Sequence, residues 1–150
     1  ILTRTNRTLT AERHEFHFVT LTLVRLDPQA RRLRYASAGQ RAFLLDAAGR
    51  TTVLESTSPP LGIEPELTVP CTEDVLLSPG SIAAFFTDGL TEAESPRLGR
   101  FGANRVLQLI HQHRQLPARQ IIDRLYQQVS QFIAPGPQHD DITIVLLKAE

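Results

Sequence analysis

The first half of the chain carries its apolar residues in short runs that are typical of strands. Residues 17–26 predict a strand because nearly every position is β-branched or apolar. Since both sets of alternating positions are apolar, this strand is expected to be buried on both faces, as in a sheet covered on two sides. The polar segment 1–12 is predicted to be the end of a helix. Further strands are predicted over residues 31–38, 41–46, 51–55, 66–77 and 82–87.

The run 82–87 is the most apolar of these segments and is therefore expected to be the central strand. After residue 100 the apolar residues recur at helical spacing, which predicts one helix over 101–113 and another over 117–133. A closing strand is predicted over 142–147. Strands, then two helices, then one strand is the order of an α+β protein with a mostly antiparallel sheet and helices packed on a sheet face.

The composition and charge of the chain disfavour some classes of function. The chain has 150 residues, the length of about one domain, and its 16 basic and 16 acidic residues are mixed along it. This pattern lacks the clustered positive charge of a nucleic-acid-binding protein. The longest uncharged apolar run is far shorter than the roughly 20 residues that span a bilayer, so no direct membrane contact is expected. The single Cys71 fits a reducing compartment, which suggests the cytoplasm.

Two acidic positions flank predicted strands. Asp88 directly follows the central strand and precedes Gly89, a residue type that lets the backbone turn freely. Asp140 and Asp141 directly precede the closing strand. If the two strands are antiparallel neighbours, these carboxylates converge, and an all-oxygen site of this kind suits Mg²⁺ or Mn²⁺. The alternatives are an ordinary turn at Asp88-Gly89 and an acidic pair that only accepts backbone hydrogen bonds.

Five stretches occur in an order that is itself informative. Residues 86–93 are Phe-Thr-Asp-Gly-Leu-Thr-Glu-Ala, and the other stretches are Phe-Val-Thr at 18–20, Tyr-Ala-Ser-Ala-Gly-Gln at 35–40, Pro-Leu-Gly at 60–62 and Gln-His-Asp-Asp-Ile-Thr at 138–143. Together they resemble the motifs of the PPM-type (protein phosphatase 2C-like) serine/threonine phosphatases of the stage II sporulation protein E and RsbU family. The resemblance extends from about residue 18 to residue 147.

The resemblance implies a binuclear Mn²⁺ or Mg²⁺ site that activates water for in-line attack on a phosphoserine or phosphothreonine. It implies Asp88 and Asp140 as metal ligands. Asp141 ranks second, because successive strand side chains point to opposite faces. The possible supporting residues are Thr87, Gly89, Glu92 and His139.

The expected fold is part of the family's αββα sandwich. The implied substrate is a regulatory phosphoprotein such as an anti-sigma-factor antagonist. The family also implies that a membrane sensor domain could be attached upstream. The sequence does not decide whether the protein forms a dimer.

The chain also departs from the family pattern. The upstream Gly-Asp-x-x-Gly-His-Gly motif, which supplies ligands to both metals, does not occur in it, and it begins at Ile1 and contains no Met. Ser37 and Gln40 replace the Asn and His of the family's Asn-Ala-Gly-His motif. Residues 1–150 are therefore expected to be the C-terminal part of a single catalytic domain whose upstream half is absent, and to be inactive alone. The alternative is a degenerate phosphatase that binds proteins without catalysis.

Three arginines follow the first acidic position, at Arg97, Arg100 and Arg105. Their charge could steer a phosphoprotein toward the carboxylates, with an ordinary solvated surface as the alternative. His111 and His113 lie two positions apart on a predicted helix and therefore point in different directions. A zinc site is not expected there.

Overall fold

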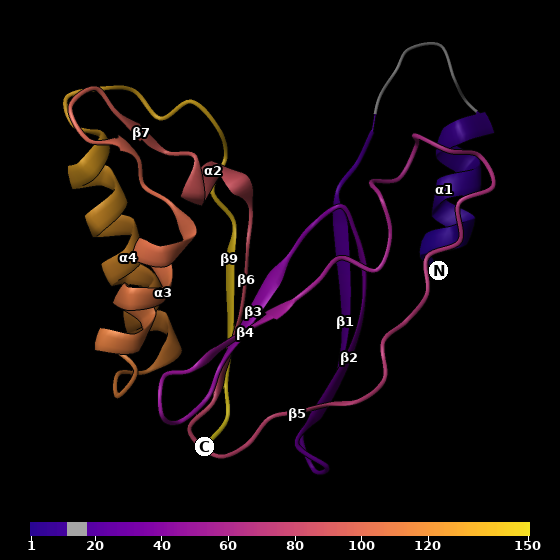
Figure 1. Cartoon of the computed structure of the whole chain (residues 1–150), viewed down its shortest axis with the longest axis horizontal. Coiled ribbons are helices and arrows are strands. Elements are labelled where there is room, and N and C mark those ends of the chain that lie inside the picture. The colour runs from indigo at the N-terminus through magenta and orange to yellow at the C-terminus, as the bar shows by residue number, and fades with distance from the viewer. Residues whose placement is uncertain (12–17) are drawn as a thin grey trace. The chain divides into compact units, whose positions relative to one another are not determined.

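The computed structural model describes residues 1–11 and 18–150. The chain forms two compact units, one of Ile1–Ala42 and Val53–Ser78 and the other of Phe43–Thr52 and Pro79–Glu150. Helices and antiparallel strands occur in both units, which confirms the α+β prediction (Figure 1). Among the helices of the described residues, none is long and apolar enough to cross a membrane.

The first unit contains one helix and a three-stranded sheet. Its elements are α1 (Leu2–Ala11), β1 (Leu21–Asp27), β2 (Arg32–Ala38) and β5 (Val75–Leu76), and the strand order is β1-β2-β5. The β1–β2 pair is antiparallel and in register from Leu21 opposite Ala38 to Asp27 opposite Arg32. The helix predicted near the N-terminus and the strand predicted over residues 31–38 are confirmed.

The prediction that the first strand is buried on both faces was wrong. Leu21 and Leu23 on β1 keep 38% and 43% of their surface exposed, whereas Leu33 and Tyr35 on β2 are buried. The reason is position: β1 is an edge strand of its sheet, and β2 is the middle one. A β-branched, apolar composition reports strand propensity and does not by itself report burial. The predicted start at residue 17 lies outside the described residues.

The strand predicted over residues 66–77 is also wrong for most of its length, because only Val75–Leu76 pairs with β2. Pro70 has no N–H to donate to a ladder. The N–H of Val69 bonds instead to the Thr3 hydroxyl, 3.2 Å away. This segment therefore runs beside α1 as irregular chain.

A buried amide joins α1 to the Pro-Leu-Gly loop. Asn6 is fully buried, and its Nδ2 donates to the carbonyl oxygens of Glu64 at 2.8 Å and Pro65 at 3.2 Å. Its Oδ1 accepts from the N–H of Gly62 at 2.8 Å. With both ends of the amide paired, the burial of this polar group is compensated.

The second unit is built on a four-stranded sheet in the order β4-β3-β6-β9. Its strands are β3 (Ala42–Leu45), β4 (Thr51–Leu54), β6 (Ile82–Phe86) and β9 (Ile144–Lys148), although the first residue of β3 and the last two residues of β4 fall within the bounds of the first unit. β6 lies between β3 and β9 and is buried at every position except Phe85, which is partly buried. The prediction of a central, fully apolar strand is confirmed.

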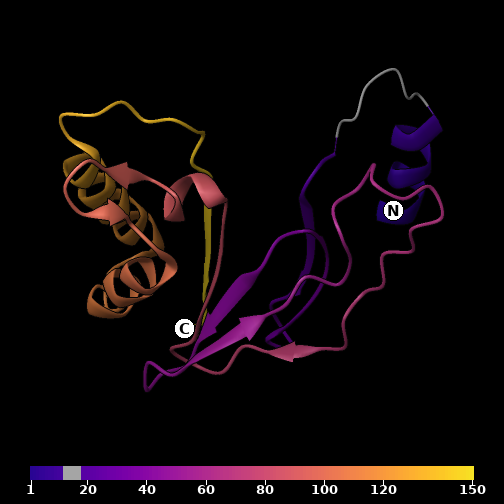
Figure 2. The ribbon, with the colours of Figure 1, turned by 45° about the horizontal axis from the view of Figure 1, so that its top comes forward.

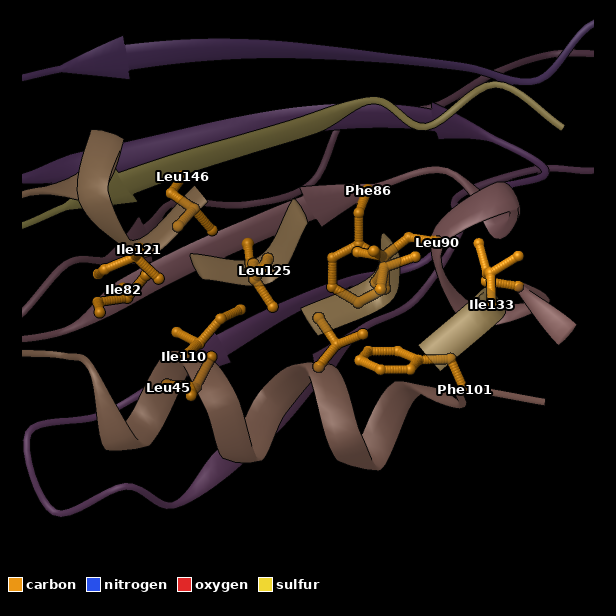
Figure 3. Close-up of a cluster of buried hydrophobic side chains, with 14 residues drawn as sticks. Leu45, Ile82, Phe86, Leu90, Phe101, Ile110, Ile121, Leu125, Ile133 and Leu146 are labelled. Carbon is orange, nitrogen blue, oxygen red and sulfur yellow. The ribbon is translucent and has the colours of Figure 1, made fainter. Parts of the chain in front are cut away.

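Two helices, α3 (Ala103–Gln112) and α4 (Ala118–Ile133), pack on this sheet and confirm the predicted pair. Each helix buries one apolar face. The core that they form with β6 and β9 is shown in Figure 3 and includes Leu45, Ile82, Phe86, Leu90, Phe101, Ile110, Ile121, Leu125, Ile133 and Leu146. Pro117 lies just before the first residue of α4.

Three short elements between β6 and α3 were not predicted: α2 (Asp88–Thr91), β7 (Glu94–Ser95) and β8 (Gly99–Arg100). β7 and β8 form a small antiparallel hairpin. The N–H of Phe101 bonds to the carbonyl of Ala93, and the N–H of Gly102 to that of Thr91, both at 2.8 Å. The hairpin is thus held against the end of α2.

Candidate functional site

The predicted pairing of β6 with β9 is confirmed. The strands are antiparallel, and their ladder ends with Phe86 opposite Ile144. Because β6 ends where β9 begins, α2 and the loop that precedes β9 lie at the same end of the pair (Figures 1 and 2). Asp88 opens α2, and Asp140 and Asp141 belong to that loop. We refer to these three residues and their backbone as the acidic edge.

Thr87 links the two sides of the acidic edge by hydrogen bonds. Its N–H bonds to the carbonyl of Thr143 at 3.1 Å, and its hydroxyl donates to the carbonyl of Asp141 at 3.1 Å. The same hydroxyl accepts from the N–H of Thr143 at 3.0 Å. These bonds continue the β6–β9 pairing beyond the strands, so the position of the acidic loop is tied to Thr87.

Gly89 is required by a close approach of two backbones. A Cβ on this residue would lie 2.4 Å from the carbonyl oxygen of Asp141 and 3.1 Å from its carbon. The backbone of Gly89 is not in the left-handed region. The expectation that this glycine serves a free turn was therefore wrong: it leaves room for the Asp141 carbonyl beside α2.

The three carboxylates of the acidic edge are exposed. One oxygen of Asp88 accepts from the N–H of Gly89 at 3.1 Å, and one of Asp140 accepts from the N–H of Asp141 at 2.8 Å. Carboxylate oxygens are hard ligands that suit Mg²⁺ or Mn²⁺. Across residues 1–11 and 18–150, however, no group of three or more His, Cys, Asp or Glu is arranged to hold a metal. The donors fit such an ion chemically, and a full ligand set is not assembled from these residues alone.

The ranking of Asp140 above Asp141 loses its original reason. The closing strand begins at Ile144 rather than at residue 142, so neither aspartate lies in a strand. The alternation of strand side chains therefore does not separate their roles. The ligand roles of both residues stay predictions.

A small cavity of about 210 Å³ adjoins the acidic edge. Its lining includes Gly89, Glu92, Arg100, His139 and Asp140. Glu92, predicted as a supporting residue, accepts a hydrogen bond from Arg100 Nη1 at 2.7 Å. His139 is exposed in the cavity lining. The sequence placed Glu92 and His139 near the site but gave no sign that Arg100 pairs with Glu92.

The three arginines that follow Asp88 have different surroundings. The guanidinium of Arg105 lies over the rings of Phe132 and Phe101, at 4.7 and 5.8 Å from their centroids. Cation–π contact of this kind holds Arg105 on the helices. Arg97 lies exposed between β7 and β8, and Arg100 lines the cavity. A common role for all three in charge steering is therefore not supported.

Comparison with known proteins identifies the family. The family model described as Stage II sporulation protein E (SpoIIE) matches residues 1–150. The chain belongs to the SpoIIE family. Among curated proteins, Protein IcfG of Synechocystis sp. is 30% identical to this SpoIIE-family chain over 129 residues, which are 85% of the chain and 20% of IcfG.

Solved structures show the fold. The SiaA-PP2C domain of Pseudomonas aeruginosa superposes with a TM-score of 0.84 at 21% identity, covering 99% of the SpoIIE-family chain and 59% of that domain. The PP2C phosphatase domain of SpoIIE from Bacillus subtilis, solved with a regulatory fragment, gives a TM-score of 0.73 at 20% identity over 97% of this chain and 42% of that one. PppA, a regulatory component of T6SS in Pseudomonas aeruginosa, gives 0.72 at 16% identity, over 99% of this chain and 67% of PppA. The chain thus has the PP2C phosphatase fold over part of the length of these relatives.

Proposed function

We propose that the protein is a divalent-metal-dependent phosphatase acting on phosphoserine or phosphothreonine in a regulatory phosphoprotein. The observation that carries the proposal is the acidic edge, where Thr87 joins the Asp88 end of β6 to the loop of Asp140 and Asp141. Membership of the SpoIIE family supports it. The chain spans 59% of the SiaA-PP2C chain and 20% of IcfG, so the activity of the whole protein is part of the proposal.

The residues that would hold the metal are Asp88 and Asp140, with Asp141 as a further or substitute ligand. Mn²⁺ or Mg²⁺ suits their oxygen atoms, and one similar structure of the SpoIIE phosphatase domain from Bacillus subtilis is described as Mn presoaked. When bound, such cations activate water and offset the charge of a phosphoryl group. For a binuclear site, we assign the remaining ligands to an upstream Gly-Asp-x-x-Gly-His-Gly motif.

The residues of this chain have separate tasks in the proposed reaction. Thr87 positions the acidic loop, and Gly89 lets that loop lie against α2. Because Asp88 and Asp140 are exposed, a phosphorylated side chain of another protein can approach them. The substrate class that we propose is the phosphorylated anti-sigma-factor antagonist. We propose that the reaction takes place in the cytoplasm. A non-catalytic binding module is the less favoured alternative, since the aspartates of both motifs are retained.

The direct test measures phosphate release by the full-length protein from a phosphoserine peptide. We expect release with Mn²⁺ or Mg²⁺, loss of release with a chelator, and recovery when the metal is restored. A phosphotyrosine peptide of the same sequence is the control for side-chain preference. Tight binding of the phosphoserine peptide without release under either metal would support the binding module instead.

The role of Thr87 gives a second expectation. Thr87→Val keeps the shape of the side chain and removes the hydroxyl that bonds to Asp141 and Thr143. Substitution of a residue that orients metal ligands typically lowers metal affinity by about 10- to 100-fold. We therefore expect Mn²⁺ to bind Thr87→Val about tenfold more weakly than the wild-type protein. Thr87→Ser retains the hydroxyl and should restore most of the affinity. Calorimetric titration with Mn²⁺ measures both variants, and unchanged affinity in Thr87→Val would contradict the positioning role.

A further inference from the structure

The cavity beside the acidic edge is lined by residues from several elements of the second unit. Gly89 and Glu92 line it from α2 and its end, Arg100 from β8, and His139 and Asp140 from the loop before β9. Asp140 belongs both to this lining and to the acidic edge. The cavity and the proposed metal site are therefore neighbours, and a group bound at one is within reach of the other.

The backbone of Arg100 is held in place by the core of the second unit. Arg100 pairs with Glu94 in the β7–β8 hairpin. Arg105, which lies over Phe132, donates through Nη1 to the carbonyl oxygens of Arg100 at 3.4 Å and Phe101 at 3.3 Å. Phe101 is itself buried. The main chain that carries Arg100 thus has a defined position at the cavity.

The side chain of Arg100, in contrast, is only lightly held. It remains 66% exposed, and its partner Glu92 is 55% exposed. Ion pairs between exposed side chains contribute little net stability, because water and salt screen them and ordering the side chains costs entropy. Exchange of Glu92 for another anion therefore requires little free energy.

The charges around the cavity favour an exchange of this kind. Its lining carries negative charge at Glu92, Glu94 and Asp140. Arg100 contributes a positive charge to the same lining. An anionic substrate that approaches the acidic edge is repelled by these carboxylates and attracted by bound cations and by Arg100. The planar guanidinium can donate two parallel hydrogen bonds to phosphoryl or carboxylate oxygens.

We propose that Arg100 is a substrate-binding residue that exchanges Glu92 for an oxyanion of the phosphoprotein. The oxyanion is either the phosphoryl group or the carboxylate of an acidic residue beside the phosphoserine. Glu92 keeps the guanidinium over the cavity while no substrate is bound. This inference rests on the proposed phosphatase function and adds to it a residue that binds an anionic group of the substrate.

The test compares three substrates of the full-length protein with Mn²⁺: a phosphoserine peptide with acidic neighbours, the same peptide with neutral neighbours, and p-nitrophenyl phosphate. Arg100→Ala is expected to raise KM for the acidic peptide about tenfold with little change in kcat. The variant cannot form the charge-assisted hydrogen bond that Arg100 makes to the bound substrate. An equal rise for all three substrates assigns Arg100 to the phosphoryl group. A rise confined to the acidic peptide assigns it to the neighbouring carboxylate.

Two matched variants make the result specific. Arg97→Ala removes the same charge from the same hairpin, outside the cavity lining, and is expected to leave KM unchanged. Arg100→Lys keeps the charge without the two parallel donors and is expected to recover only part of the affinity. Unchanged KM in Arg100→Ala for all three substrates, or an equal rise in Arg97→Ala, would overturn the inference.

A binding measurement separates this inference from the proposed function. A peptide in which a phosphonate replaces the phosphoserine phosphate cannot be hydrolysed, and its affinity is measured by fluorescence anisotropy. We expect Arg100→Ala to weaken its binding about tenfold, in line with KM. If the wild-type protein bound this peptide through Arg100 but hydrolysed none of the three substrates, the phosphatase proposal would fail and the Arg100 site would stand. Equal binding by wild type and Arg100→Ala would remove the site even in an active enzyme.

Discussion

Asp88→Asn is expected to lower phosphate release by the full-length protein at least about a hundredfold while the protein stays folded. The carboxylate would act on the charge that develops in the transition state, and removal of one such electrostatic group costs on the order of 3 kcal/mol. Asp88 is exposed, and the hydrogen bond that it accepts from the N–H of Gly89 can also be accepted by an Asn amide oxygen. The fold should therefore be little affected.

Turnover of a phosphoserine peptide at saturating Mn²⁺ and the thermal unfolding midpoint measure the two parts of this expectation. Asp123→Asn is the matched control, because Asp123 is an exposed acid on α4 whose partner is Arg119. Near-normal turnover in Asp88→Asn would refute the ligand assignment. An unfolded variant would instead show that Asp88 has a structural role.

Gly89→Ala is expected to have the second largest effect, a loss of turnover of roughly thirtyfold to a hundredfold. The added Cβ would lie 2.4 Å from the carbonyl oxygen of Asp141, which is backbone and cannot move aside as a flexible side chain can. The acidic loop must therefore shift relative to Asp88. Misplacement of catalytic groups by about 1 Å can cost on the order of a hundredfold in rate.

The control for this variant is Gly102→Ala. Gly102 has a φ of +81° but open space around its missing Cβ, so the substitution introduces backbone strain without a collision. Because its ψ is 148°, a conformation that is adopted almost only by glycine, we expect Gly102→Ala to lose on the order of 1–3 kcal/mol of stability and to retain its turnover. If Gly89→Ala were as active as the wild-type protein, the close contact with the Asp141 carbonyl would have no functional role.

Much of the second unit could be predicted from local patterns. The helical period over residues 101–113 and 117–133 was strong enough to define α3 and α4. The uninterrupted apolar run of β6 predicted a central strand, and the structure places it between two neighbours. Periodicity and burial agree here because the sheet face is covered by helices that follow in the same sequence.

The first unit shows where local patterns fail. Residues 66–77 contain apolar and β-branched positions, yet only Val75–Leu76 pairs with another strand. Strand formation depends on a partner with free hydrogen-bonding groups, and this information is not contained in the segment itself. The exposure of Leu21 and Leu23 has a similar origin, since the edge position of β1 is a property of the sheet.

The sequence by itself determined which residues carry the candidate chemistry, since the Thr-Asp-Gly and Asp-Asp stretches and their order along the chain were sufficient to indicate Asp88, Asp140 and Asp141. Only the tertiary structure decided how the neighbouring residues serve them. The Thr87 hydroxyl bonds to a carbonyl 54 positions away, and Gly89 lies against the same residue, Asp141. The pairing of Arg100 with Glu92 likewise depends on the fold of the β7–β8 hairpin. Hydrogen bonds and steric contacts act over a few ångströms in space, so they are settled only when distant parts of the chain have come together.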